Sequence, residues 1–287
     1  MPPIQAPTIR LRQLGLELRR RREAAGLKIE DAAYHLECSI AKVSRIELAK
    51  AKPRVRDVRD LCELYGVDGN DRDLLVRLAK DAQAPGWWDE YQDVLSAQFG
   101  SFMGMEHEAN SVRCYEALLV PGIFQTRSYA EAVLRGTLLP PQNTETEIER
   151  RLEVRLHRQR LLEREPRPRV WAILDEAVLR RPAGGRAVHR GQLERLLAEC
   201  ERDGVDLQVL PFERGVHAAL DGPFYLFGFP APAHPDVVYV ESQSGNSYLE
   251  KSGNVARHAQ MFSLLAAQAL DPDRSRRFIE ERIEECQ

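Results

Sequence analysis

Hydrophobic residues recur at helical spacing through the first 83 residues of the chain. Their positions predict five short helices, over residues 11–25, two within 29–48, 55–65 and 71–83. Gly26 and Gly66 follow the first and fourth of these segments, where a glycine commonly ends a helix. Five short helices within about 75 residues indicate a compact all-α domain.

The two helices within residues 29–48 are joined by a tight turn. Their inward-facing positions are apolar: Ala33, Leu36, Val43 and Ile46. The small side chain of Ala33 would allow two crossing helices to approach closely, and Ser39 is a natural N-cap for the second helix. This arrangement predicts a helix-turn-helix, although an ordinary helical hairpin would show the same spacing.

The second of these helices, the reading helix, would present a mixed outer face to solvent. That face carries Ile40, Ala41, Lys42, Ser44 and Arg45. In a helix-turn-helix, this face enters the major groove of double-stranded DNA. Because two of its residues are apolar, base recognition would depend on Ser44, Arg45 and apolar contacts with thymine methyl groups.

Charge separates this segment from the rest of the chain. Residues 10–59 contain fourteen Lys or Arg and seven Asp or Glu, a net charge of about +7, whereas the whole chain is formally −3. A basic module on an acidic body favours contact with DNA phosphates at one end of the protein. The expected phosphate contacts surround Pro53, in the loop after the reading helix and at the start of the fourth helix. They are Lys50, Lys52, Arg54, Arg56 and Arg59.

Four consecutive arginines, Arg19 to Arg22, lie in the first predicted helix. Successive helical residues are rotated by about 100°, so these four side chains cannot share one face. Arg22 lies four residues after Leu18 on the inward stripe and therefore needs a carboxylate partner. Glu47, near the end of the reading helix, is the expected partner in a structural ion pair that ties the two helices together.

Short motifs are distributed through this segment: Leu18-Arg19-Arg20, Arg22 to Leu27, Ser39, Val43 to Glu47, Pro53 and Leu64 to Val67. Together they resemble the Xre or phage-repressor type of helix-turn-helix. The resemblance implies that the residues facing base edges are Ser39, Ile40, Ala41, Ser44 and Arg45, and it supports the pairing of Arg22 with Glu47.

Three positions depart from the family pattern. Ile29 replaces a polar residue that usually contacts the DNA backbone, and Glu37 and Ala49 replace two usual glycines. The turn glycine has a left-handed backbone conformation, so we expect Glu37 to adopt that conformation despite its side chain.

The periodicity changes after residue 110. Apolar runs predict strands at residues 111–120, 169–174, 205–210, 224–229 and 237–241. Helices are expected at residues 127–135, 144–164, 186–203, 255–269 and 275–285. Interspersed strands and helices predict an α/β or α+β domain with a mixed central sheet. The highly charged helix at 144–164 fits either a solvated surface helix or a contact surface for a partner.

We therefore expect four parts in the chain: a flexible arm at 1–9, a helix-turn-helix DNA-binding domain at 10–83, a linker or docking segment at 84–110, and an α/β partner-binding or dimerisation domain at 111–287. Pro85 and Gly86 break the helical pattern at the start of the third part. Trp87 and Trp88 follow them. Paired tryptophans serve as packing residues more often than as a ligand cage.

Composition and motif content restrict the chemistry. The chain is 43% hydrophobic and 30% charged, and no apolar run is long enough to span a membrane, so we expect a cytoplasmic protein. Five scattered cysteines without CxxC spacing predict neither a disulfide framework nor a zinc site. Without any nucleophile-elbow, metalloprotease or phosphate-loop motif, we expect no catalytic residues, metal or cofactor. The best polar candidates for catalysis would be His217, Asp221, Glu241 and Glu250.

Longer motifs fill the C-terminal part: Gly86 to Trp88, Tyr115-Glu116, Leu119 to Thr126, Tyr129-Ala130, Arg150 to Arg155, Leu174 to Pro182, Val209 to Phe212, Gly222 to Phe224 and Val237 to Glu241. In this order they resemble the C-terminal domain of actinobacterial WhiJ-like, or antitoxin-like, regulators. The resemblance implies a repressor that binds its own promoter region. It also implies that the C-terminal domain binds a small partner protein encoded nearby, a second copy of itself, or both.

The leading hypothesis is a sequence-specific transcriptional regulator, acting as a repressor. We expect a homodimer on a palindromic operator, because one helix-turn-helix domain (the reading head) contacts too few base pairs to give much sequence specificity. The alternative is a small-molecule sensor whose pocket would be lined by Trp87, Trp88, Phe224, Tyr225 and Tyr239. An enzyme fused to a DNA-binding head is a third hypothesis.

Overall fold

A computed structural model of the chain describes residues 9–84, 86–230, 235–242 and 245–286. The flexible arm expected at residues 1–9 lies outside the described residues, except for Ile9, which begins the first helix. The chain divides into two compact units. Of the described residues, the N-terminal unit comprises 9–84, 86–92 and 96–105, and the C-terminal unit comprises 93–95, 106–230, 235–242 and 245–286.

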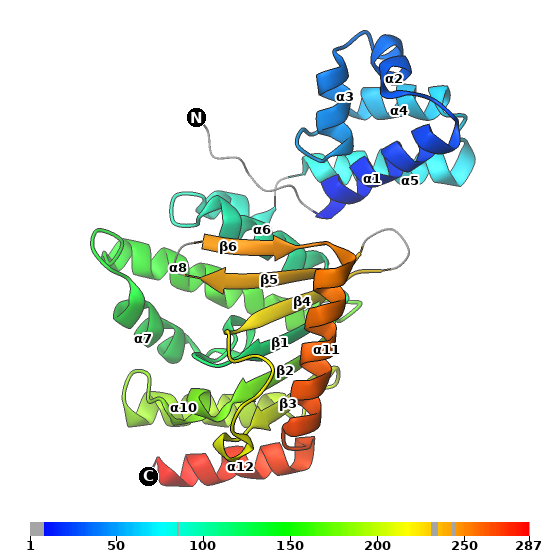
Figure 1. Ribbon diagram of the computed structural model, residues 1–287. Coiled ribbons are helices and arrows are strands. Elements are labelled where there is room, and N and C mark those ends of the chain that lie inside the picture. The colour runs from blue at the N-terminus through cyan, green and yellow to red at the C-terminus, as the bar shows by residue number, and fades with distance from the viewer. Residues whose placement is uncertain (1–8, 85, 231–234, 243–244, 287) are drawn as a thin grey trace. The chain divides into compact units, whose positions relative to one another are not determined.

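The N-terminal unit is helical, as the hydrophobic spacing predicts (Figure 1). Its described part contains α1 (Ile9–Ala24), α2 (Ile29–His35), α3 (Ile40–Glu47), α4 (Val55–Leu64) and α5 (Gly69–Gln83). The segment at 84–110, expected as a linker, includes the 3-10 helix η1 (Trp87–Tyr91) and α6 (Ala97–Glu108). The five expected helices are therefore confirmed, with ends that differ by one or two residues.

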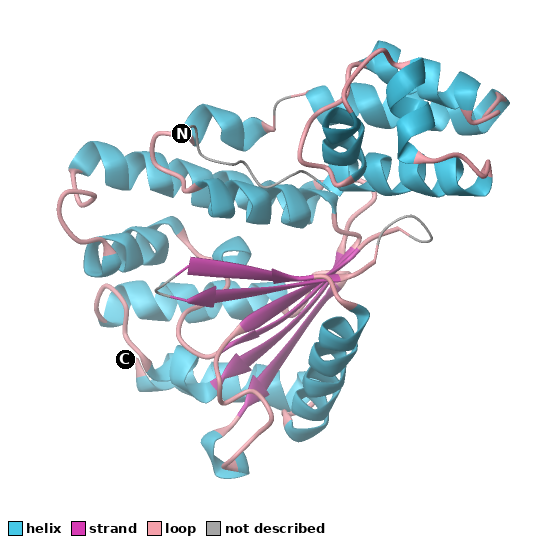
Figure 2. Ribbon diagram, turned by 45° about the horizontal axis from the view of Figure 1, so that its top comes forward, coloured by secondary structure: helices cyan, strands magenta, loops and turns pink. Residues whose placement is uncertain are grey.

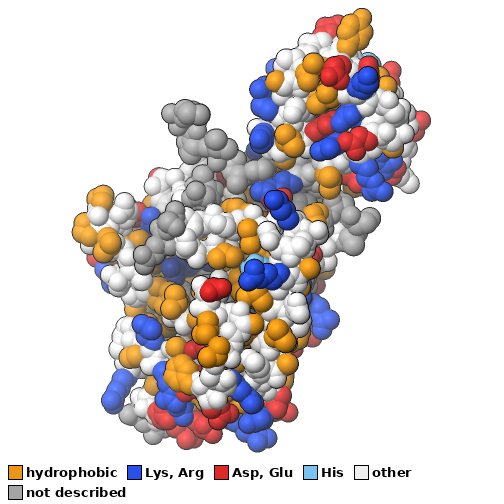
Figure 3. All heavy atoms as spheres, viewed as in Figure 1, with side chains coloured by type: hydrophobic (Ala, Val, Ile, Leu, Met, Phe, Trp, Pro, Cys, Tyr) orange, Lys and Arg blue, Asp and Glu red, His pale blue; other side chains and the backbone are white. Residues whose placement is uncertain are grey.

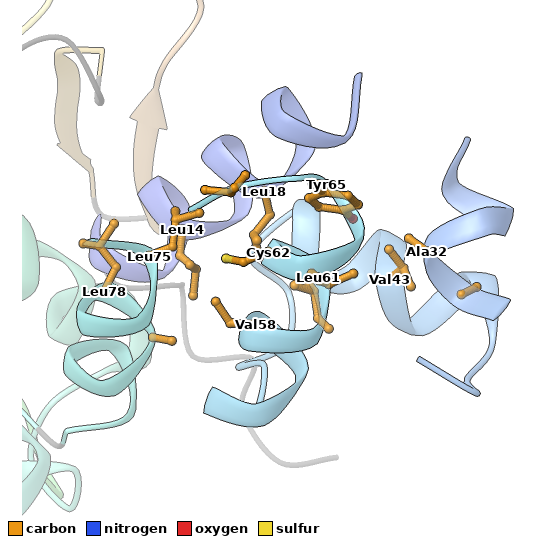
Figure 4. Packing of buried hydrophobic residues seen from close by; sticks show 14 residues of the cluster. Leu14, Leu18, Ala32, Val43, Val58, Leu61, Cys62, Tyr65, Leu75 and Leu78 are labelled. Carbon is orange, nitrogen blue, oxygen red and sulfur yellow. The ribbon is translucent and has the colours of Figure 1, made fainter. Parts of the chain in front are cut away.

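Leucines from several helices form the core of this unit. Leu14 and Leu18 of α1 are completely buried and pack in one cluster with Val43, Val58 and Leu61 (Figure 4). Close packing of α1 on the end of α3 depends on Gly15. A Cβ at this position would lie 2.7 Å from the carbonyl oxygens of Ile46 and Glu47. The absent side chain thus allows the two backbones to meet.

Two non-glycine residues of this unit have positive φ angles, Glu37 at +47° and Ala49 at +56°. They are the positions where glycines were expected by resemblance, and the left-handed conformation expected for Glu37 is confirmed. Glu37 lies in the turn between α2 and α3, and Ala49 follows α3. Each side chain costs the backbone about 1 kcal/mol relative to glycine. Backbone hydrogen bonds close both turns, from the N–H of Cys38 to the carbonyl oxygen of Ala33 at 2.9 Å and from the N–H of Lys50 to that of Arg45 at 2.6 Å.

The C-terminal unit is built on a mixed sheet, which confirms the α/β prediction. Its six described strands lie in the order β3-β2-β1-β4-β5-β6. They are β1 (Ser111–Glu116), β2 (Arg169–Asp175), β3 (Val205–Leu210), β4 (Phe224–Gly228), β5 (Val237–Ser242) and β6 (Gly245–Leu249). The first three strands are parallel to one another, and β4, β5 and β6 are each antiparallel to the preceding strand in the order.

Helices cover both faces of this sheet (Figure 2). The helices that follow β1 are α7 (Arg127–Thr137), α8 (Glu145–Arg158), α9 (Glu176–Arg180), α10 (Arg186–Glu199), α11 (Ser252–Gln268) and α12 (Pro272–Glu285). On one face, Phe262 and Leu265 of α11 pack against Tyr115, Ile173 and Leu226 of the strands. The helices α7, α8 and α10 lie on the opposite side (Figures 1 and 2).

Several details differ from the sequence-based expectations. The first strand ends at Glu116 rather than at residue 120, and the long helix of 144–164 ends at Arg158 and continues as a 3-10 helix, Gln159–Glu163. The short helix α9 and the edge strand β6 were not expected. β6 has the sequence Gly-Asn-Ser-Tyr-Leu, which lacks an apolar pattern, and it is paired on one side by β5.

The C-terminal unit also encloses charge. Arg158 at the end of α8 donates from Nε and Nη2 to the two carboxylate oxygens of Glu106, both at 2.8 Å, with the two side chains 7% and 4% exposed. Gly122 leaves room for this guanidinium, since a Cβ there would lie 2.6 Å from Nη1 of Arg158. Nearby on the sheet, Tyr225 donates a hydrogen bond of 2.7 Å to Glu116. Burial raises the pKa of Glu116 to about 7.

Candidate nucleic-acid interface

The reading helix α3 has an apolar inner face and an exposed outer face. Ser39 caps it by accepting a hydrogen bond of 3.2 Å from the backbone N–H of Lys42. Val43 and Ile46 are buried in the helical core. On the other side Ile40 is 48% exposed, and Ser39, Ala41 and Arg45 are also exposed. The structure therefore exposes most of the residues expected to face base edges, with Ser44 half-buried at the margin.

The ion pair expected between Arg22 and Glu47 is present. Arg22 donates from Nε and Nη2 to the two carboxylate oxygens of Glu47, at 2.7 and 2.9 Å. Its Nη1 also donates to the carbonyl oxygen of Leu27 at 2.9 Å. Hydrogen bonding to Glu47 raises the pKa of Arg22, and both side chains are buried. The pair joins α1, the segment before α2, and the end of α3, and so fixes the orientation of the reading helix.

Exposed cations continue from the reading helix into the following loop. Arg45, Lys50, Lys52 and Arg54 are all exposed, and none has an ion-pair partner in the part of the chain that the structure describes. The loop itself is anchored, because Pro53 is buried and its carbonyl oxygen accepts a hydrogen bond of 3.0 Å from Gln83 of α5. Unpaired cations on an anchored loop are well suited to phosphate contacts.

Lys42 differs from these cations. Its Nζ lies 2.7 Å from Oδ2 of Asp57 in the first turn of α4, so the side chain is directed to a neighbouring helix. The sequence pattern places Lys42 on the DNA-facing surface and does not indicate this partner. No spacing rule links the two residues, because they belong to different helices.

A hollow of about 470 Å³ lies beside the reading helix. Its lining includes Arg19 and Arg22 of α1, Lys28 before α2, and Ser44 and Leu48 at the end of the reading helix. Lys28 is exposed and directly precedes Ile29, the residue that departs from the family pattern. We regard Lys28 as a further candidate phosphate contact that sequence reasoning missed. The sequence does place Lys28 immediately before α2, the first helix of the helix-turn-helix, and this position could have indicated the contact.

Trp87 and Trp88 pack edge to face, with ring centroids 5.8 Å apart, and Trp87 also contacts Tyr91 at 6.2 Å. Gly86 and Gly104 border Trp88, since a Cβ at these positions would lie 2.3 and 3.4 Å from its ring. The tryptophans are half-buried. Within the N-terminal unit they therefore pack against aromatic and glycine neighbours.

The aromatic pocket of the small-molecule alternative is not formed. Phe224, Tyr225 and Tyr239 are 2%, 8% and 1% exposed. Phe224 and Tyr225 are consecutive in β4, so their side chains point to opposite faces of the sheet. Phe224 packs on the α11 side, whereas Tyr225 contacts Tyr239 with ring centroids 6.3 Å apart. These residues are core, and the expectation that they share one pocket is wrong.

The polar candidates for catalysis are dispersed. His217 accepts a hydrogen bond of 3.3 Å at Nδ1 from the backbone N–H of Ala219, and its Nε2 lies 3.3 Å from the hydroxyl of Tyr115. The Tyr115 hydroxyl in turn donates to Asp175 at 3.3 Å. Asp221 and Glu241 are exposed elsewhere. Among the described residues, no group of three His, Cys, Asp or Glu side chains could hold a metal ion.

Comparison with known proteins finds family models that match two parts of the chain. Residues 13–75 match the model of a helix-turn-helix domain, and residues 99–281 match a domain of unknown function, DUF5753. No significant match is found among curated proteins or solved structures. Within the described residues, no helix is both long and apolar enough to cross a membrane. The DUF5753 match extends over more than half of the chain, and the protein therefore belongs to the DUF5753 family, with a helix-turn-helix domain at its N-terminus.

Proposed function

We propose that this protein is a sequence-specific transcriptional repressor with an Xre-type reading head. The observation that carries the proposal is the exposed outer face of α3. It is continued on an anchored loop by the cations Lys50, Lys52 and Arg54, which have no ion-pair partner among the described residues. The phosphate contacts would set the register on the duplex, and the outer face of α3 would read bases in the major groove.

Within this face, Arg45 is the residue best suited to base recognition. A guanidinium can donate two hydrogen bonds to the O6 and N7 of guanine, whereas a serine hydroxyl is less selective. Ile40 and Ala41 would contact thymine methyl groups. We propose that two chains bind a palindromic operator together, because a single small head of this kind gives modest specificity.

We further propose an antitoxin-like, WhiJ-like mode of regulation. The motifs of the C-terminal part support it through their resemblance to that group. In this mode the C-terminal domain binds a small protein encoded by a neighbouring gene, a second copy of the chain, or both, and the bound partner changes the affinity of the reading head for its operator.

The C-terminal domain is proposed to act by binding rather than by catalysis, without a cofactor. His217, its best catalytic candidate, has both ring nitrogens engaged within its own loop and with the core residue Tyr115. This arrangement suits a histidine that fastens a loop. His217→Ala should therefore lower stability more than it alters any regulatory activity, as measured by thermal unfolding and by an operator-driven reporter.

The test is fluorescence anisotropy with the DNA upstream of the gene and with a scrambled duplex, at several salt concentrations and with or without the neighbouring small protein. Arg45→Ala should weaken binding to the upstream DNA by about 1–3 kcal/mol, with little effect on the scrambled duplex. Arg77→Ala, which removes an exposed cation of α5, is the matched control. Equal affinity for the two duplexes in the wild type would overturn the proposal of specific recognition.

The same titrations test the regulatory mode. A change in operator affinity on adding the neighbouring protein would support the antitoxin-like mode. Specific binding whose affinity is unchanged by the neighbouring protein would argue against the proposed partner and for control by a small molecule.

A further inference from the structure

The Lys42–Asp57 pair lies at the edge of the reading face. Lys42 occupies the first turn of α3, and Asp57 occupies the first turn of α4. The ammonium and the carboxylate oxygen are 2.7 Å apart, and the side chains of Lys42 and Asp57 are 36% and 13% exposed. Because the carboxylate is largely shielded from solvent, its position is set by packing, and the lysine is held against it.

The other cations of the candidate interface behave differently. Arg45, Lys50, Lys52 and Arg54 have no ion-pair partner in the described part of the chain. The pair thus removes one cation from a surface that is otherwise free to bind phosphates. Figure 3 shows acidic side chains among the basic ones on the visible face of the N-terminal unit. Asp57 is a carboxylate that contacts Lys42 on the outer face of the reading helix.

We infer that Asp57 is a positioning residue that restrains Lys42 and thereby limits the affinity of the reading head for DNA of arbitrary sequence. The inference rests on the proposed function. A lysine ammonium on its flexible stem can meet any phosphate and can also donate to guanine, so it adds affinity with little selectivity. Held by Asp57, Lys42 makes no such contact, and recognition is left to Arg45 and the apolar residues of the face.

The restraint should affect non-specific complexes more than the operator complex. A complex without base contacts can shift along the duplex until a released ammonium reaches a phosphate, whereas base contacts fix the register of the operator complex. Releasing Lys42 should therefore raise the affinity for scrambled DNA more than the affinity for the operator. The restraint by Asp57 would thus increase the selectivity of the protein for its operator and lower its total affinity for DNA.

The experiment compares four proteins on upstream and scrambled duplexes across a salt series. Asp57→Asn releases Lys42. Glu63→Gln removes an equal charge from the same helix, at an exposed residue without an ion-pair partner among the described residues. The double variant Lys42→Gln with Asp57→Asn replaces the charged pair by a neutral one. Circular dichroism confirms that all four are folded.

For Asp57→Asn, the slope of log K against log salt on scrambled DNA should become steeper by about 0.9, equivalent to one additional phosphate contact. The ratio of operator to scrambled affinity should fall several-fold. Glu63→Gln should keep the wild-type slope, and the double variant should return to it. A merely structural role for Asp57 would lower the melting temperature without steepening the slope.

Two failures are distinguishable. If the wild type binds the operator and Asp57→Asn has the same slope and selectivity as Glu63→Gln, the inference about Asp57 is wrong while the proposed function stands. If the wild type does not prefer the upstream DNA, the proposed function itself fails.

Discussion

The two units of this protein use buried ion pairs in different settings. In the N-terminal unit, Arg22 and Glu47 fasten three short segments, and their helices expose cations directly beside this pair. In the C-terminal unit, Arg158 and Glu106 are buried at one end of α8, and Glu116 lies close by with a raised pKa. The first pair orients the reading helix α3, whose outer face is exposed to solvent. The second stabilises an interior that already has a sheet and helices on both faces.

The difference has an energetic consequence. Removing one member of a buried pair leaves a charge without compensation, whereas a pair at the surface is replaced by water at little cost. We therefore expect each unit to depend strongly on its buried ion pair and little on its surface pairs. The N-terminal unit should depend in addition on close helix packing and on turn conformation.

The largest expected effect is that of Glu106→Gln. It keeps the shape of the side chain but leaves the Arg158 guanidinium buried without its counter-charge, which should lower the free energy of unfolding of the C-terminal unit by about 3–5 kcal/mol. Urea unfolding followed by circular dichroism measures the loss. Glu149→Gln, which breaks the pair of Glu149 with Arg127 where both side chains are 53% exposed, should change little. Similar losses in both variants would contradict the expected difference between a buried and an exposed ion pair.

Glu116 should make the stability of the same unit depend on pH. Burial raises its pKa from 4.5 to about 7 in the folded state, so the folded protein holds a proton that the unfolded chain releases between these values. Its contribution to stability is present below pH 4.5 and is lost as the pH rises through about 7. Glu116→Gln should remove this loss and be more stable than the wild type at pH 8, by at most about 3 kcal/mol.

Melting temperatures of both proteins from pH 4.5 to 8 provide the measurement. The advantage of the variant should grow with pH across this range. An advantage that is constant with pH would show that Glu116 is not protonated in the folded state at neutral pH.

Gly15→Ala tests the backbone contact in the N-terminal unit. The added methyl group would lie 2.7 Å from two carbonyl oxygens at the end of α3, so α1 must shift, at a cost of about 1–3 kcal/mol. DNA binding should weaken as well, because the reading helix loses its support. Gly191→Ala, in α10 with nothing within 4 Å of the added methyl group, should instead stabilise its helix by up to about 1 kcal/mol. Thermal unfolding measures the change in stability of both variants. A change of the same sign in both would contradict the role given to Gly15.

The smallest effect concerns the turn of the helix-turn-helix. Glu37 has φ +47°, so Glu37→Gly should stabilise the N-terminal unit by about 0.5–1 kcal/mol. The same substitution at the exposed helical residue Glu63 should destabilise it by a similar amount. Chemical denaturation measures the free energy of unfolding of both variants and of the wild type. A loss of stability in Glu37→Gly would mean that the Glu37 carboxylate stabilises the turn.

Much of the N-terminal unit could be predicted because its information is local. Apolar spacing indicates the five helices, and resemblance to a reading head indicates that a glycine position is occupied by Glu37. The pairing of Arg22 with Glu47 is an exception, because the two residues are 25 positions apart. The inward stripe predicts that Arg22 needs a carboxylate, and the family resemblance supports Glu47 as its partner. By contrast, the partner of Lys42 was missed, because the arrangement of α3 and α4 in space decides which side chains meet.

The C-terminal unit was predicted in class but less well in detail. Continuous apolar runs indicate buried strands, so five strands and the mixed sheet could be expected. The strand β6 has a polar sequence and depends on hydrogen bonds to β5. The aromatic residues expected to line a pocket were instead divided between the two faces of β4 and β5, because alternation along a strand separates neighbours.

The sequence by itself determined the elements whose causes lie within a few residues: the helices, the N-cap at Ser39, the basic charge of residues 10–59 and the strands with strong apolar runs. Only the tertiary structure decided the order of the strands, the burial of Arg158 with Glu106, the raised pKa of Glu116 and the restraint of Lys42 by Asp57. The physical reason is that periodicity and turn preferences are local. Desolvation and ion pairing depend on residues that are distant in the chain and meet only after folding.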